Sequence, residues 1–439
     1  MSDNAPLAWY DNFRHMYLVV NARGVYAPHT ESQFKRYLRG RGYKATPGEY
    51  ELTSDAEECM MDLIHEYDVD YTGPLAGYMK GIHEFNGLRI LITAEPKIID
   101  PAPGEWPLLR TIIDGLFADP EEDQVTYVMG WLKRSYESLI AHKFDPGQAL
   151  VLAGPSNVGK SLFQKIITDI LGGRSARPYQ FMTEGSPFNS DLFGSEHLMI
   201  DDEQRSTDTK SRRAFGVKIK NFCASAEGQR CHGKNANPVM LRPFWRVTIS
   251  VNDDPENLEM LPPMQEESIQ DKLIVLKCSP FPMVMPGAER DTRYAAIYAE
   301  LPAFLHHLTE WQIPATHRSG RWGIVHYCHP ELAVALLQLS PEGRLVDLLD
   351  SITLEQDGFP TREWVGTATE LLEALKADQQ HGHEFSRMYQ YGPARLGKHL
   401  SRLAKQMPER FAHKHTTGNK QVWSVRQENF ELAFAGTPE

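Results

Sequence analysis

The chain has 439 residues, of which 41% are hydrophobic and 24% charged, values typical of a globular protein with two or three domains. No run approaches the roughly 18 apolar residues of a membrane helix, no signal-peptide pattern is visible, and five scattered cysteines argue against a disulfide framework, so we expect a cytoplasmic protein without a membrane partner. The net charge is -12, but residues 385–426 hold nine Lys or Arg and one acid, so any nucleic-acid binding must be local.

The first region, residues 1–140, mixes short apolar segments with turn-rich stretches. A strand is predicted at 90–93 and a helix at 125–140, with a proline-rich stretch between them. Asp68 and Asp70 form a DxD motif, but no companion motif of a primase accompanies them. We therefore expect this region to be a collar of helices and strands that supports assembly or recruits partners.

The second region, residues 141–320, alternates short apolar strands with helical segments, which indicates an α/β fold with a mainly parallel sheet. Its clearest motif lies between an apolar strand at 149–153 and an amphipathic helix at 162–171. The pattern GxxxxGK[ST] is matched in full by Gly154, Pro155, Ser156, Asn157, Val158, Gly159, Lys160 and Ser161.

This motif predicts a phosphate-binding loop for ATP. Its glycines permit unusual backbone angles, and the N–H groups at the start of the helix, up to Leu162, can cradle phosphates. Lys160 is expected to reach the β- and γ-phosphates, and the Ser161 hydroxyl is expected to bind Mg²⁺.

A second motif follows about 40 residues later, where the short apolar strand 198–200 ends in Asp201, Asp202 and Glu203. ATP hydrolysis needs one carboxylate to hold Mg²⁺ and another to polarise the attacking water. We expect this strand to lie next to the strand of the phosphate loop, with Asp201 and Asp202 as the working pair. Glu203 is the competing choice for the base.

A third motif is the alternating strand 247–251, which ends in Asn252. An amide at the tip of a neighbouring strand can orient the lytic water or contact the γ-phosphate. Taken alone, an Asn after a strand is most often a turn former. Its position after the phosphate loop and the acidic strand favours the catalytic interpretation.

The order GPSNVGKS, HLMIDDE and VTISVND, with a basic segment before the third motif, resembles the superfamily 3 helicases. The similarity is greatest to the helicase part of poxvirus- and phage-type primase-helicases, and it covers about residues 141–280. This resemblance implies an AAA+ ATPase that forms a ring, commonly a hexamer, and translocates on single-stranded DNA.

The resemblance also implies a hairpin before the Asn strand that carries basic residues into the ring channel, here Arg230, His232 and Lys234. The family usually has an arginine after the Asn strand that acts on the neighbouring subunit's ATP. This chain departs from that pattern, because the first basic residue after Asn252 is Lys272 and the next arginine is Arg290. Lys272 is the first choice for this role, and the alternatives are Arg205, Arg242 and Arg246.

The third region, residues 325–439, resembles a winged helix-turn-helix domain. Residues 367–375 are predicted to form the first helix of the pair, and 393–407 the basic second helix. A wing is expected around the turn at 418–419. Four cations lie off the apolar stripe of the second helix and are expected to contact DNA, namely Arg395, Lys398, Arg402 and Lys405. The alternative is a solvated helix in a protein-binding domain.

These observations together predict an ATP- and Mg²⁺-dependent replicative DNA helicase of a phage or other mobile element. The expected partners are single-stranded and forked DNA, further copies of the same chain, and a separate primase or loader. Two alternatives stay open. One is an origin-binding initiator that uses ATP as an assembly switch, and the other is an ATPase that acts on protein partners.

Overall fold

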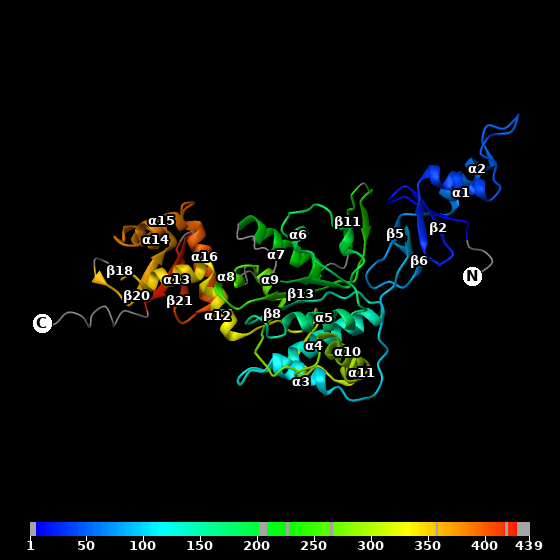
Figure 1. The fold of residues 1–439 in the computed structure, drawn as a ribbon. Helices are drawn as coiled ribbons and strands as arrows, with labels where there is room; N and C mark the ends of the chain where they lie inside the picture. The colour runs from blue at the N-terminus through cyan, green and yellow to red at the C-terminus, as the bar shows by residue number, and fades with distance from the viewer. Residues whose placement is uncertain are drawn as a thin grey trace. The chain divides into compact units, whose positions relative to one another are not determined.

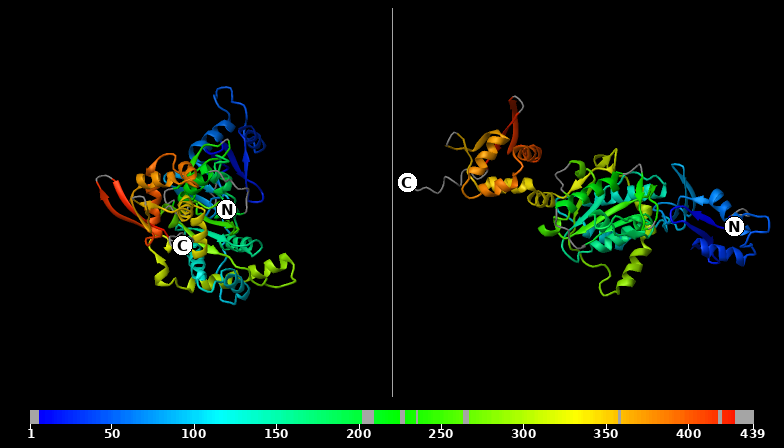
Figure 2. Two further views of the ribbon diagram at one scale, coloured as in Figure 1. Left: turned by 90° about the vertical axis from the view of Figure 1, so that its left-hand side faces the viewer. Right: turned by 90° about the horizontal axis from the view of Figure 1, so that it is seen from above.

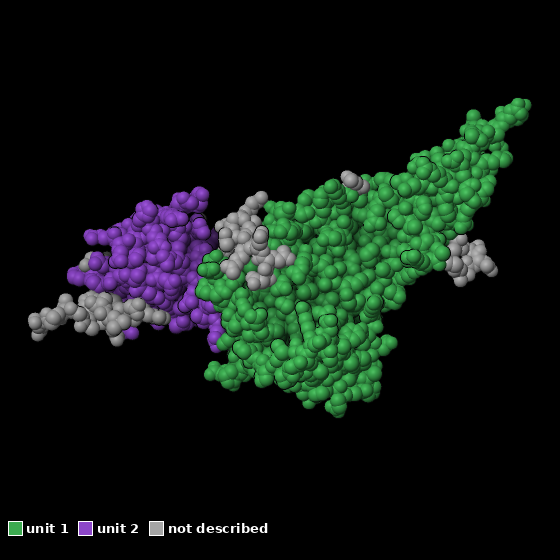
Figure 3. Space-filling view, viewed as in Figure 1, with its two compact units in different colours: residues 1–262, 268–329 green, residues 263–267, 330–439 purple. Residues whose placement is uncertain are grey.

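The computed structural model describes residues 6–201, 209–224, 228–234, 236–262, 267–356, 359–417 and 420–427. The chain divides into two compact units, residues 1–262 with 268–329, and residues 263–267 with 330–439 (Figure 3). In the described part of the chain, no helix has the length and apolarity to cross a bilayer.

A six-stranded sheet organises the first unit (Figure 1). Every neighbouring pair in it is parallel, which confirms the predicted α/β class with a parallel sheet. Its two innermost strands carry no exposed residue, as expected for a sheet covered on both faces. In spatial order the strands are β17 (Tyr327–Cys328), β14 (Leu273–Lys277), β8 (Ala149–Ala153), β13 (Arg246–Val251), β10 (His197–Ile200) and β9 (Ser175–Ala176).

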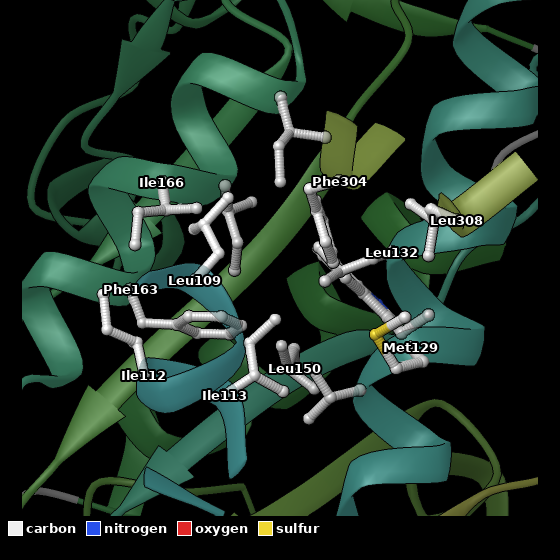
Figure 4. Close-up of a cluster of buried hydrophobic side chains, with 14 of the residues drawn as sticks. Leu109, Ile112, Ile113, Met129, Leu132, Leu150, Phe163, Ile166, Phe304 and Leu308 are labelled. Carbon is white, nitrogen blue, oxygen red and sulfur yellow. The ribbon is translucent and has the colours of Figure 1, made fainter. Parts of the chain in front are cut away.

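Helices cover both faces of this sheet, and one face holds the largest apolar core. Figure 4 shows side chains from five elements of that face pointing toward one another. The elements are α3 (Pro107–Leu116), α4 (Gln124–Ile140), β8, α5 (Lys160–Ile170) and α11 (Leu301–Glu310), with α10 (Arg290–Ala299) beside them. The helix predicted at 125–140 thus exists, but it packs in the core of the sheet rather than with the strands that precede it. The opposite face carries α6 (Tyr179–Met182) and α7 (Thr209–Ala224).

The N-terminal region, residues 6–93, consists of two small sheets and two helices. Its first sheet packs on α1 and α2 through a core that includes stacked Tyr17 and Phe34 rings. Both helices begin with capping boxes, at Thr30 and Ser54, which satisfy the first N–H groups of each helix. The elements are β1 (Trp9–Asp11), β2 (Met16–Val20), β3 (Tyr26–His29), α1 (Glu31–Gly40), α2 (Asp55–Glu66), β4 (Asp68–Val69), β5 (Tyr71–Gly73), β6 (Gly81–Phe85) and β7 (Leu88–Ile92).

A buried ion pair joins the N-terminal region to the central sheet. Glu196, fully buried just before β10, accepts hydrogen bonds from Arg174 and from the backbone N–H of Gly77 at 2.8 Å. Arg174 also donates to the carbonyls of Leu75 and Ala94. Removing either charge would leave the other buried without its partner, so this junction is costly to open.

The second unit is a bundle of short helices with a three-stranded antiparallel sheet in the order β20-β22-β21. The two expected helices are α14 (Ala368–Ala377) and α16 (Pro393–Gln406), but a helix that the sequence did not reveal, α15 (Gly382–Met388), lies between them. The long ribbon of β21 (Phe411–Thr417) and β22 (Lys420–Arg426), seen in Figure 2, packs against α14 and α16 through Phe411, Trp423 and Val425. The other elements are α12 (Pro330–Gln338), α13 (Pro341–Asp350), β18 (Glu355–Gln356), β19 (Phe359–Pro360) and β20 (Glu363–Thr367).

Candidate nucleotide site and nucleic-acid surfaces

The loop after β8 has the backbone geometry that the motif predicts. Gly154 lies so close to Cys278 that a Cβ would collide with the Cys278 carbonyl oxygen. Gly159 has φ +108°, and Asn157 has φ 62°, both in the left-handed region. The loop therefore turns sharply into α5, whose first N–H groups and dipole favour an anion.

Lys160 and Asn252 meet at this loop. The Lys160 ammonium donates to the carbonyls of Gly154 at 2.5 Å and Pro155 at 2.7 Å, and to Asn252 Oδ1 at 3.1 Å. The register explains the encounter, because Val251 pairs with Ala153 and the next residue on each strand is Asn252 or Gly154. The structure thus brings the first and third motifs into direct contact.

The acidic strand occupies a different position from the expected one. β13 lies between β8 and β10, so the strand that ends at Asp201 is two positions from the phosphate-loop strand rather than next to it. The expectation of adjacency was wrong, because strand order in a parallel sheet depends on crossover connections that local sequence does not encode. Asp202 and Glu203 lie outside the described residues.

Asp201 nevertheless shares a cavity of about 930 Å³ with the phosphate loop. Its carboxylate is half-buried and lies 4.0 Å from an Arg177 guanidinium nitrogen. Ser161 is exposed to the cavity at the start of α5. A hydroxyl and a carboxylate are oxygen donors of the kind Mg²⁺ prefers, so Ser161 and Asp201 fit this ion.

The far wall of the cavity comes from α10, which sequence reasoning did not connect with the site. Arg290, Arg293 and Tyr294 line it, together with Met283, Ile297 and Lys165. The Lys165 ammonium lies 3.8 Å from the centre of the Tyr294 ring, a cation–π contact. Arg293 is engaged with the carbonyls of Val284 and Ala288. Arg290, the first residue of α10, thus lines the cavity of its own chain.

A buried polar network lies beneath α5. His197 contacts the Thr168 hydroxyl at 2.7 Å through Nδ1 and the Thr248 hydroxyl at 2.8 Å through Nε2. Gln164 donates to Thr248 and to the Ile200 carbonyl. Complete burial lowers the pKa of His197 to about 3, so this imidazole is neutral and links α5 to both β10 and β13.

Three of the four cations considered for action on a neighbouring subunit are described, and each has a partner within the chain. Lys272 is buried and paired with Asp271 at 2.7 Å. Arg246 is also buried, it donates to Ser135 and to the Trp245 carbonyl, and burial lowers its pKa to about 10. Arg242 lies 6.0 Å from the Phe144 ring centre, and Arg205 is outside the described residues. Lys272, Arg246 and Arg242, the described members of this set, do not line the cavity.

The basic segment before β13 forms an antiparallel hairpin of β11 (Gln229–Cys231) and β12 (Val239–Leu241). Arg230 and Lys234 are exposed, whereas His232 is half-buried and contacts the Phe188 ring. Two of the three predicted DNA-contacting side chains are therefore open to solvent.

The basic helix α16 presents its predicted cations unequally. Arg395, Lys398 and Lys405 are exposed, but Arg402 donates to Glu342 of α13 at 2.6 Å. The Glu342 side chain is only 2% exposed. Arg402 thus compensates a buried carboxylate, a role that the helical spacing could not reveal.

Comparisons with known proteins address the fold. A model described as a family of unknown function (DUF5906) matches residues 152–267, which hold the whole loop motif 154–161, the hairpin and Asn252. No curated protein matches the chain. The apo structure of the NrS-1 C terminal region (305–718) aligns with TM-score 0.56 and 13% identity over 96% of this chain and 95% of that chain. The A form apo structure of the same region aligns with TM-score 0.55 and 12% identity over 96% of this chain and 96% of that chain.

A structure of the SCCmec type IV Cch active helicase aligns with TM-score 0.31 and 12% identity over 89% of this chain and 67% of that chain. The two NrS-1 alignments, with TM-scores of 0.56 and 0.55, show that the chain shares its fold with that region along nearly its whole length.

Proposed function

We propose that this protein is an ATP-hydrolysing, ring-forming DNA helicase of the superfamily 3 type, with the AAA+ core in its first unit. The observation that carries the proposal is the convergence of Lys160, Asn252, Ser161 and Asp201 on one cavity at the carboxyl edge of a parallel sheet. Ligands bind at this edge in open α/β sheets. The shared fold with the NrS-1 C terminal region supports the architecture.

In this proposal the loop amides at the start of α5 hold the phosphates of ATP, and Lys160 moves from the loop carbonyls to the β- and γ-phosphates. Ser161 and Asp201 hold Mg²⁺, which neutralises charge on the phosphates. Asn252 orients the attacking water or contacts the γ-phosphate, and Asp202 or Glu203 polarises that water. The adenine base of ATP lies against the wall formed by α10, where Tyr294 and Ile297 offer apolar surface.

The nucleic-acid contacts in this proposal come from the hairpin and from α16. Arg230, His232 and Lys234 face the single strand, and Arg395, Lys398 and Lys405 of a winged helix contact duplex phosphates. Arg402 is not needed as a DNA ligand, because it is held by Glu342. A cytoplasmic location, a hexameric ring, and a separate primase or loader complete the proposal.

The deciding experiment compares the ATPase rate with and without single-stranded DNA, in wild type and in Lys234→Ala, with single-particle imaging of the ATP-bound protein. We expect rings, a rate stimulated by DNA, and a lower stimulation ratio in the variant. An ATPase rate indifferent to every nucleic acid would overturn the helicase proposal in favour of action on protein partners.

The exposed cations of α16 also favour a second candidate, an origin-binding initiator that uses ATP to assemble. Displacement of a strand from a forked substrate separates the two. A sequence-specific footprint on duplex DNA without strand displacement would support the initiator.

A further inference from the structure

The loop of the β11–β12 hairpin is held on one side by Asn189, which follows α6 in the first unit. Asn189, which is 4% exposed, donates through Nδ2 to the Arg230 carbonyl at 2.9 Å. Its Oδ1 accepts from the His232 N–H at 2.8 Å, and its own N–H donates to the His232 carbonyl at 3.0 Å. One amide residue thus satisfies three backbone groups on either side of Cys231.

The other side of the loop is fixed by the N-terminal region. The Asn237 N–H donates to the Phe13 carbonyl at 3.1 Å, in the turn between β1 and β2. The Asn237 side-chain nitrogen lies 3.1 Å from His15 Nε2 and 3.5 Å from the Asn12 carbonyl. His15 has φ 57°, a left-handed conformation that residues other than glycine adopt at a cost. The turn is thus held in this shape where it meets the hairpin.

Arg14 lies beside the contact between the β1–β2 turn and the hairpin loop. Phe13 is buried, and its ring edge is 3.4 Å from where a Cβ would lie on Gly233, the residue before Lys234. The Arg14 guanidinium lies 5.7 Å from the centre of the same ring, and Arg14 is exposed. Burial raises the pKa of the Cys231 thiol to about 12, and the Arg14 charge acts against that rise, as expected for neighbouring groups.

The acids around this contact are mostly engaged. Asp11 is buried and accepts the N–H groups of Phe13 and Arg14 at 2.8 and 3.2 Å. Asp68 accepts from the Asn12 side chain. Asp191 is the exposed acid close to Cys231.

We propose that the β1–β2 turn, residues 12–15, is part of the surface that binds single-stranded nucleic acid, with Arg14 as a phosphate contact beside the loop that carries Lys234. The turn also supports the hairpin loop, through the contacts of Asn237 and Gly233. This inference rests on the proposed function, and it assigns the N-terminal region a direct role in nucleic-acid binding.

The test measures binding of a fluorescent oligothymidylate by anisotropy between about 50 and 200 mM salt. The variants are Arg14→Ala, the charge-retaining Arg14→Lys, and Arg23→Ala, which removes an exposed arginine from the loop between β2 and β3 of the same region. Thermal unfolding of each variant checks that it is folded. We expect Arg14→Ala to weaken binding about 5- to 10-fold and to reduce the salt slope by about 0.7, the change for one lost phosphate contact on a single strand.

Arg14→Lys is expected to keep most of the affinity, and Arg23→Ala to match wild type. If wild type binds and Arg14→Ala binds with the same affinity and slope, the inference is wrong and the proposed function stands. Equal losses in Arg14→Ala and Arg23→Ala would reduce the effect to net charge and would also overturn the inference. No binding by wild type would remove the proposed function itself.

Discussion

Lys160 and Arg402 are both cations that the sequence predicts to bind phosphates, and the structure treats them differently. The Lys160 ammonium donates to the carbonyls of Gly154 and Pro155 and to the Asn252 side chain, and it lines the cavity. Arg402 is bound to the buried carboxylate of Glu342, 60 residues away. Lys160 thus already lies where the proposal puts the phosphates, whereas Arg402 would have to abandon a buried carboxylate to contact DNA.

The difference shows that a cation's position on a helix does not establish its availability. The glycines of the loop and the pairing of β8 with β13 determine which groups surround Lys160. These features lie within the motif or next to it in the sequence. The partner of Arg402 comes from another helix, and the cost of leaving Glu342 uncompensated makes the pair structural.

Substitution of Lys160 should have the largest effect. We expect Lys160→Ala to lower the rate of ATP hydrolysis by at least about 100-fold, because a cation at the developing phosphate charge contributes about 3 kcal/mol or more. A phosphate-release assay measures this, with Lys143→Ala, an exposed lysine, as the matched control. Near-normal turnover in Lys160→Ala would show that Lys160, like Arg402, does not act as a phosphate ligand.

Substitution of Arg402 should act on stability. We expect Arg402→Ala to cost about 1–3 kcal/mol, since Glu342 loses a charge-assisted hydrogen bond while it stays buried. Lys398→Ala, on the same helix but exposed, should change stability by no more than about 0.5 kcal/mol. Hydrogen exchange in peptides from α13 and α16 reports the local effect. Equal protection in the two variants would show that Arg402 is as dispensable as its neighbour.

The network beneath α5 gives the most specific effect, because it is confined to pH values below about 6.5. The pKa of His197 is about 3 in the folded protein and near 6.5 when unfolded, so the unfolded state binds the extra proton between these values. Its contribution to stability is present above pH 6.5 and is lost, at about 1.4 kcal/mol per pH unit, on acidification through that window. Urea unfolding at several pH values should show a shallower pH dependence in His197→Gln. An unchanged slope would mean that another group titrates.

Elements whose determinants are local could be predicted from the sequence. The strand at 149–153 and the Asn252 strand were predicted within a residue, because apolar runs and glycines mark them. The order of β8, β13 and β10 in the sheet was not predicted correctly, since it depends on the crossover connections between the strands. The α10 wall and the Glu342 partner were also missed, because neither has a motif and each reaches its site from a distant part of the chain.

The strand β10 is anchored at both ends to different parts of the protein. Glu196, just before it, accepts the Gly77 N–H, and Asp201, just after it, lines the cavity. A four-residue strand has little length in which to absorb a bend. A tilt of β10 that moves Asp201 must therefore either move residues 75–77 with it or break the hydrogen bond at Gly77, which couples the position of Asp201 to the attachment of the N-terminal region.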